Sequence, residues 1–316
     1  MAIWPDAYYF SLVMFKGDRR NYLGPTVCAL GRQASLRGAD AALRCQALGK
    51  TYGPVLAASL DGETAPAHNI LMSVELTANG AGRRLFVWRH SFTANSLSAA
   101  SAVAVAPFVA ADDGLGGRLS YRQDGGREAI VATHTVRHES GAAALRWYEL
   151  RISNGTWRTY QQGTQAPDRA QRWRGAIAMD RMGNIALAYN AAGADKAPGV
   201  RYTGRQRSGA PGRMDGEETI VNGNGVQLDA GEQGAGALSA DSIGQAIGGD
   251  DGEKIAVKTG KEVGEKAAGK AYAGRGSLVV DPVDGCTFWS TQQYVPLTGR
   301  NTARTRIAAF RFDNCR

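Results

Sequence analysis

The side chains able to do chemistry are spread along these 316 residues rather than gathered in a motif. The chain has no GxSxG, no Walker loop and no HExxH. His134 and His138 are four residues apart, a spacing that chelates a metal on a helix, but 129–136 has the pattern of a strand. Four residues of strand span about 13 Å, too far to share one ion. His68 and His90 have no acidic or cysteine neighbour in a motif, so the sequence predicts no metal site and no cofactor.

The four cysteines form an even set, Cys28, Cys45, Cys286 and Cys315, and none belongs to a CxxC pair, which argues against zinc. Their grouping near the two ends of the chain predicts two local disulfides, Cys28–Cys45 and Cys286–Cys315. Disulfides indicate an oxidising compartment. The first residues nevertheless lack the basic and apolar regions of a signal peptide, and no apolar run reaches the 18 residues of a membrane span.

The composition is that of a globular protein with unusually many turns. Hydrophobic residues make up 43% and charged residues 21% of the chain, which excludes wholesale disorder. The 41 glycines show no collagen period and fall between short β-branched or aromatic runs. The net charge is +8, but only Arg19–Arg20 and Arg83–Arg84 are adjacent arginines, so the basic stripe of a nucleic-acid-binding protein is absent and no nucleic-acid partner is expected.

These runs and turns predict many short strands and one helix, Gln33–Leu48. Their lengths and spacing are typical of a sandwich, barrel or propeller rather than of βαβ units. The expected strands are 7–16, 25–30, 69–76, 85–91, 101–105, 118–122, 129–136, 143–151, 156–161, 176–179, 185–189, 199–203, 277–280, 287–291 and 305–312.

An internal repeat favours the propeller among these all-β folds. Residues 176–189 form an apolar run, an Asp turn with a glycine, and a second apolar run, and residues 277–289 repeat this order. Weaker copies begin near Asp6, Val55 and Arg118. The sequence therefore predicts a single all-β domain over 1–316, a β-propeller of about five blade-like repeats.

One long insertion interrupts the repeats at 222–274. Five of the eight lysines, Lys254, Lys258, Lys261, Lys266 and Lys270, fall there among acids and recurring glycines. A glycine every four or five residues opposes a helix, at about 1 kcal/mol each relative to alanine. The insertion is expected to be a mobile, Lys/Gly-rich loop, and a functional lid is the alternative.

Several segments together resemble a group of large secreted bacterial β-propeller proteins with a sialidase-like superfold. The matching segments are 4–9 (WPDAYY), 27–30 (VCAL), 146–151 (RWYELR), 160–164 (YQQGT), 172–180 (RWRGAIAMD), 201–205 (RYTGR), 281–289 (DPVDGCTFW) and 305–307 (TRI). The resemblance implies a secreted or cell-surface protein. Members of the group continue upstream of the WPD segment, so this chain is expected to be a truncated or degenerate copy that forms an open or incomplete arc of blades. Gly117 and Ala273–Arg275 stand where members carry acids at blade entrances.

The entrances of the inner strands are where a propeller of this kind would bind a ligand. The candidates for this rim are Trp4, Asp6, Tyr8, Arg118, Tyr121, Trp173 and Arg201. Aromatic, Arg and Asp side chains together could hold a glycan or an anionic ligand. The alternative is that the tryptophans fill the core between blades and the arginines pair with turn carboxylates.

The functional expectation is a non-catalytic extracellular binding or structural module, whose partner is a glycan or another extracellular protein. No acid/base pair stands out, so no catalytic residue is proposed and enzymatic activity is left open. The alternative is a glycoside hydrolase of the sialidase type, in which Arg118, Arg201 and Arg306, from different repeats, would clamp a carboxylate.

Overall fold

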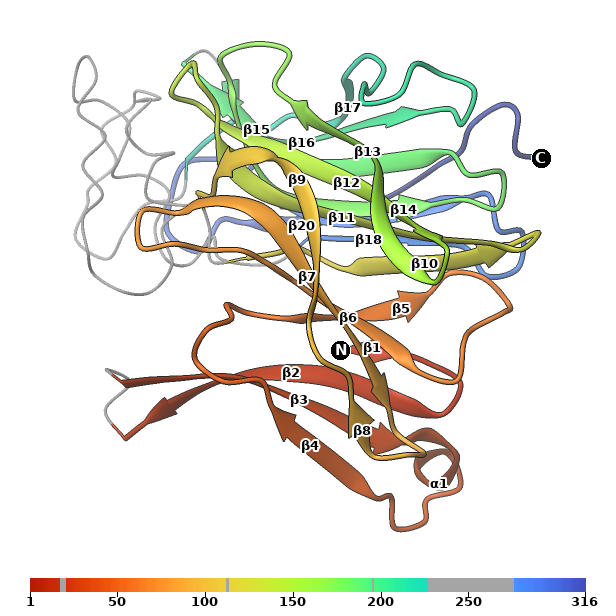
Figure 1. Cartoon of the computed structure of the whole chain (residues 1–316). Helices are drawn as coiled ribbons and strands as arrows, with labels where there is room; N and C mark the ends of the chain where they lie inside the picture. Colours follow the sequence, from red (N-terminus) through yellow and green to blue (C-terminus); the bar gives the residue numbers. More distant parts are fainter. Residues whose placement is uncertain (18–20, 112–113, 195, 227–275) are drawn as a thin grey trace.

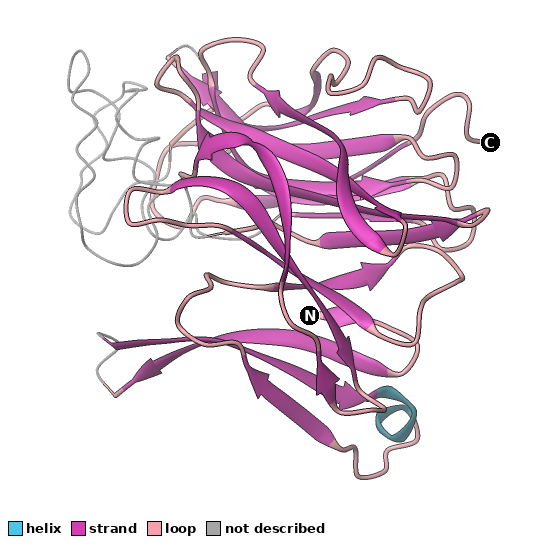
Figure 2. Ribbon diagram, viewed as in Figure 1, coloured by secondary structure: helices cyan, strands magenta, loops and turns pink. Residues whose placement is uncertain are grey.

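The computed structural model describes residues 1–17, 21–111, 114–194, 196–226 and 276–316. The expected insertion at 222–274 lies almost entirely outside these residues. The described part is built of strands, with one short helix, α1 (Arg32–Leu36), as Figure 2 shows. No helix among the described residues is long and apolar enough to cross a membrane.

The strands group into blades in the order of the chain. The first blade contains β1 (Ala2–Ile3), β2 (Ala7–Lys16), β3 (Asn21–Gly31) and β4 (Leu43–Ala47). The second contains β5 (Leu56–Leu60), β6 (Asn69–Val74), β7 (Ala81–Ser91), β8 (Ser96–Leu97) and β9 (Ser101–Val109). Figure 1 shows the first blade at the bottom of the view, the second above it and the later blades at the top.

Three further blades follow. The third contains β10 (Leu119–Asp124), β11 (Arg127–Arg137), β12 (Ala143–Ser153) and β13 (Thr156–Gln165). The fourth contains β14 (Gln171–Met179), β15 (Ile185–Gly193), β16 (Lys196–Arg205) and β17 (Glu218–Val221), and the fifth contains β18 (Ser277–Val280), β19 (Phe288–Tyr294) and β20 (Arg304–Phe310). Neighbouring strands within a blade run antiparallel, as in a β-meander.

The innermost strands of the blades lie side by side in sequence order, β1 with β5, β5 with β10, β10 with β14 and β14 with β18. Radial sheets around inner strands define a propeller-like fold, so the predicted all-β fold class is confirmed. The second and third blades are joined more closely than the others. Their inner strands β5 and β10 pair in parallel, with Ser120 opposite Ser59, which makes one nine-stranded sheet of the two blades.

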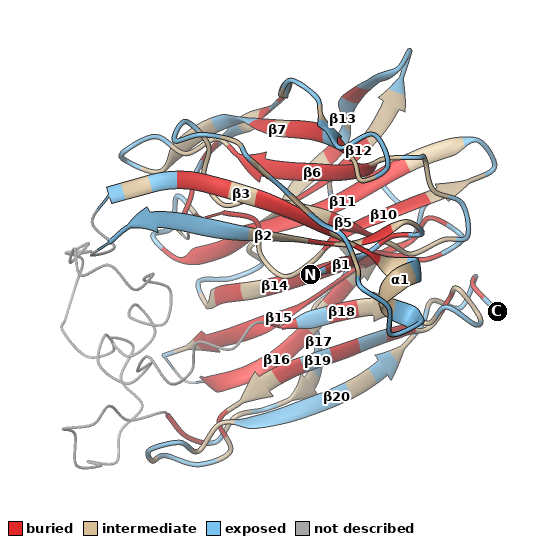
Figure 3. Cartoon of the chain, turned by 90° about the horizontal axis from the view of Figure 1, so that it is seen from below, coloured by how far each residue is buried: buried red, intermediate tan, exposed pale blue. Residues whose placement is uncertain are grey.

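The strands of the fourth blade are apolar on both faces because each face packs against a neighbouring blade. Successive side chains of a strand point to opposite faces. On β14 the larger Ile177 and Met179 face the core shared with the third blade. The intervening Ala176 and Ala178 face the fifth blade, where Phe288 fills the space that the small alanines leave. Figure 3 shows the resulting buried stretches in the middle of the strands.

Both predicted disulfides are confirmed, Cys28–Cys45 and Cys286–Cys315. The first one explains why the predicted helix Gln33–Leu48 is wrong for most of its length. Cys45 lies on β4, directly opposite Cys28 on β3, so the second half of the segment is a strand. The helix ends after Leu36, and Gly38 has a φ of +66°, a conformation that continues no helix.

Candidate functional site

Four of the seven predicted rim residues are core residues in the structure. Trp4, Tyr121 and Trp173 are at most 2% exposed, and Trp4 packs edge-to-face on Tyr121 with the ring centroids 5.1 Å apart. Arg201 is 8% exposed and donates to the carbonyl oxygens of Val200 and Val221. The two tryptophans are thus buried as in the alternative, whereas Arg201 pairs with groups of its own blade rather than with a turn carboxylate.

No hydrogen bond or ion pair joins the remaining three candidates, Asp6, Tyr8 and Arg118, to one another among the described residues. Asp6 accepts a hydrogen bond of 3.1 Å from the Tyr9 hydroxyl, and Tyr8 is half-buried on β2. Arg118 forms an ion pair with Asp61, with its Nη1 2.6 Å from Oδ2, and Ser120 donates to the same carboxylate. Arg118 is therefore committed to Asp61, a residue that the sequence analysis did not single out.

The two histidines with helix-like spacing also have separate partners. His134 is buried, with its Nε2 2.9 Å from the Tyr148 hydroxyl, whereas the Nδ1 of His138 lies 2.9 Å from Ser140 Oγ in an exposed turn. Among the described residues, no group of three or more His, Cys, Asp or Glu side chains is arranged to hold a metal ion.

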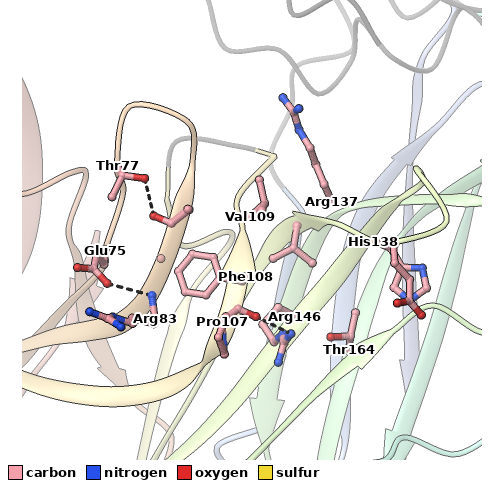
Figure 4. A pocket seen from close by; sticks show the side chains of 14 residues that line it. Glu75, Thr77, Arg83, Pro107, Phe108, Val109, Arg137, His138, Arg146 and Thr164 are labelled. Atoms are coloured by element: carbon pink, nitrogen blue, oxygen red, sulfur yellow. Dashed lines mark hydrogen bonds between the residues drawn. The ribbon is translucent and has the colours of Figure 1, made fainter. Parts of the chain in front are cut away.

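The structure contains a pocket of about 1030 Å³ where the second and third blades meet. Its wall combines the β6–β7 turn and the end of β9 from the second blade with the β11–β12 turn from the third, as Figure 4 shows. The lining side chains include Glu75, Thr77, Arg83, Phe108, Arg137, His138, Glu139, Arg146 and Thr164.

Glu75 supplies a carboxylate to one side of this pocket. Its Oε1 accepts from Arg84 Nε at 2.9 Å, and its Oε2 accepts from the backbone N–H of Arg83 at 2.9 Å. The hydrogen bond from Arg84, together with that from the Arg83 backbone, lowers the pKa of Glu75. Glu75 is therefore ionised at neutral pH, and the two donors fix its orientation.

The apolar part of the pocket wall depends on a glycine, which lets an aromatic ring pack directly on the backbone of the neighbouring strand. Phe108 on β9 lies over Gly82 on β7, and a Cβ at Gly82 would overlap both the Phe108 ring and the Glu75 carbonyl oxygen. The Phe108 ring also packs edge-to-face on the ring of the buried His134, with the ring centroids 4.7 Å apart. Phe108 is only 6% exposed, so it belongs to the core that supports the pocket wall.

The third-blade side of the pocket carries exposed polar groups. His138 and Glu139 are in the turn after β11, and in Figure 4 His138 lies across the pocket from Glu75. Arg146 on β12 donates to the Pro107 carbonyl at a long 3.5 Å, and its buried Nε has no partner among the described residues. The pocket thus combines an ionised carboxylate, an exposed carboxyl group and guanidinium donors, a set that can bind and act on a polar ligand.

The sequence analysis did not identify this pocket, because its residues come from five strands and two turns. Only the register of β7 with β9, which puts Gly82 opposite Phe108, brings Glu75 and Phe108 together. The only local signal is the His138–Glu139 pair in a turn, and such a pair is common on any protein surface.

No protein-family model matches the chain, and the search of curated proteins gives no match. Solved structures with a similar fold include an α-L-arabinanase of Penicillium chrysogenum complexed with arabinobiose (TM-score 0.40, 8% identity), and the match covers 98% of this chain and 94% of that one. An α-L-arabinofuranosidase of Fusarium graminearum with arabinobiose has a TM-score of 0.38 at 9% identity, with 98% and 94% covered. An exo-1,5-α-L-arabinanase from a bovine ruminal metagenomic library has a TM-score of 0.31 at 13% identity, with 84% and 96% covered.

These comparisons contradict the expectation of a non-catalytic binding or structural module, because the similar structures named above are glycoside hydrolases. The expectation of a non-catalytic module is therefore not carried forward. The comparisons bear on the fold and identify no residue of this chain, so any assignment of the chemistry has to come from the pocket itself.

Proposed function

We propose that the chain is an extracellular glycoside hydrolase whose substrate binds in the pocket between the second and third blades. The observation that carries the proposal is that two carboxyl groups from different blades, Glu75 and Glu139, line one pocket of about 1030 Å³. Glycosidases commonly cleave with two carboxyl groups that flank the scissile bond. A volume of this size accommodates an oligosaccharide.

The environment of Glu75 assigns the roles of the two carboxyl groups. Glu75 is held ionised by Arg84 and the Arg83 backbone, so it would stabilise the positive charge that develops at the anomeric carbon. Glu139, the second carboxyl group that lines the pocket, takes the remaining role of proton donor to the leaving oxygen in this proposal. Arg146 would donate to the hydroxyl groups of the sugar.

The test is hydrolysis of a panel of fluorogenic glycosides, including an α-L-arabinofuranoside and a sialoside, by the refolded, oxidised chain. Glu75→Gln and Glu139→Gln should each lower kcat at least a hundredfold, since positioned acid–base groups contribute about 10²–10⁴-fold. Glu218→Gln, an exposed glutamate on β17, is the matched control and should keep full activity.

Two results would refute the proposal. One is the absence of turnover on every glycoside of the panel. The other is turnover that survives in Glu75→Gln and Glu139→Gln but is lost in Asp6→Asn, which would move the reaction to the rim predicted from the sequence. A glycan array with the inactive variants would then show which sugars are bound without being cleaved.

A further inference from the structure

A second cluster of charged residues lies at the opposite end of the third blade from the pocket. Arg137, which lines the pocket, is the last residue of β11, and Arg127 is the first. Ten steps along a strand span about 33 Å, so the two ends are separate sites. The cluster at the Arg127 end serves neither the pocket nor the predicted rim.

Two arginine side chains from different blades approach the same turn at this end. Gly183, in the turn between β14 and β15, has a φ of +85° and carries no side chain. The position that a Cβ would take there is 3.4 Å from Arg127 Nη2 and 3.2 Å from Arg207 Cδ. The third-blade Arg127 and the fourth-blade Arg207 therefore flank the same small space.

More positive charge lies behind this pair. Asp124 is opposite Arg127, and Arg122 is opposite Ala129, so Arg122 and Arg127 project from the same face of the β10–β11 hairpin. Arg122 is 5% exposed, and its buried Nη2 has no hydrogen-bond partner among the described residues.

The neighbouring acids are already committed. Asp124 accepts from Arg122 Nη1 at 3.3 Å, and Glu149 accepts from Arg151 at 2.6 Å. Asp180 accepts from the backbone N–H groups of Met182 and Asn184. Within the described part of the chain, neither Arg127 nor Arg207 has an acceptor for its guanidinium group. Burial, with the nearby charges of Arg207 and Arg151, accordingly lowers the pKa of Arg127.

We propose that Arg127 and Arg207, with Arg122 behind them, form a binding site for a tetrahedral oxyanion, the sulfate ester or phosphate group of a ligand. A tetrahedral oxyanion presents enough oxygens to accept from two guanidinium groups that approach from different blades. The bound anion would offset the repulsion between Arg127 and Arg207, and it would bind from the solvent side, where Arg207 is exposed.

The proposal is tested by isothermal titration of the chain with inorganic sulfate and inorganic phosphate at constant ionic strength, and by thermal unfolding with the same salts. Wild-type protein should bind and gain thermal stability with sulfate or phosphate relative to chloride. Arg127→Gln and Arg207→Gln should each weaken binding at least tenfold. Arg306→Gln, which removes an exposed arginine on β20, should bind as wild type.

The natural source of the group is distinguished with glucose 6-sulfate and glucose 6-phosphate, with glucose as the neutral control. Tighter binding of one ester identifies the source. The proposal fails if wild-type protein binds neither inorganic anion, or if the Arg127→Gln/Arg207→Gln double variant gains the same stability from sulfate as wild type. Misfolding is excluded without added anion, where Arg127→Gln should unfold no earlier than wild type because it relieves the repulsion with Arg207.

Discussion

At the scale of single residues, His134 shows how burial behind the pocket controls a protonation state. The imidazole is 1% exposed, accepts or donates one hydrogen bond with Tyr148, and lies against the Phe108 ring that supports the pocket wall. Burial, together with the positive charge of Arg146, lowers the pKa of His134 to about 3. The ring is therefore neutral in the folded chain at any ordinary pH.

This burial predicts a loss of stability in mild acid. In the unfolded chain a histidine has a pKa of about 6.5, so the contribution of neutral His134 is complete above that pH and is lost progressively as the pH falls toward 3. Each pH unit in that window costs about 1.4 kcal/mol for one proton. In His134→Gln the free energy of unfolding should depend less steeply on pH between 6 and 4.

Urea titrations at several pH values measure this slope. His138→Gln is the control, because His138 is in an exposed turn and should leave the slope unchanged. The lowered pKa values of His68 and His90 add to the acid sensitivity in both variants alike. An unchanged slope in His134→Gln would contradict the assignment of a buried neutral ring.

At the scale of elements, the inner strands of the second and third blades are tied by the Asp61–Arg118 ion pair. Asp61 follows β5 and Arg118 precedes β10, and the side chains are 3% and 18% exposed. Breaking one side of a buried pair leaves an uncompensated charge, which costs about 3–5 kcal/mol when both groups are fully buried.

We expect Asp61→Asn to lower the free energy of unfolding by about 2 kcal/mol, less than the full penalty because Arg118 keeps some contact with solvent. Asp40→Asn, an exposed aspartate, should change it by no more than about 0.5 kcal/mol. A double-mutant cycle with Arg118→Gln isolates the coupling between the two side chains. Independent, additive effects would show that the pair does not join the two blades.

The elements also show how far sequence reasoning reaches. Turn spacing identified the strands well, and the predicted strand 7–16 coincides with β2. The helix prediction failed over 37–48 because a local pattern cannot show that Cys45 will be opposite Cys28. The pocket was missed for a related reason. Glu75, Phe108 and His138 come together only through the register of β7 with β9 and the contact between two blades.

At the scale of the whole molecule, the all-β fold and the two disulfides could be predicted from the sequence, whereas the burial of the rim candidates could not. Trp4 and Trp173 are of a residue type that often binds ligands at a propeller rim. Only the structure shows that both side chains are buried in the core. The open or incomplete arc of blades stays a prediction. The apolar residues exposed on β2, with Leu12 at 48% and Val13 at 42%, make solution mass its natural test.

The parallel pairing of β5 with β10 has a consequence for how the molecule comes apart. The inner strands of the second and third blades pair directly through main-chain hydrogen bonds, which joins these two blades into one sheet. These two blades should therefore behave as one cooperative unit and open together. The amide hydrogens of β5 and β10 should exchange with solvent at one common slow rate, measured by native-state exchange and mass spectrometry. Faster exchange in the fifth blade, which has three strands, would then reveal the order in which the blades detach.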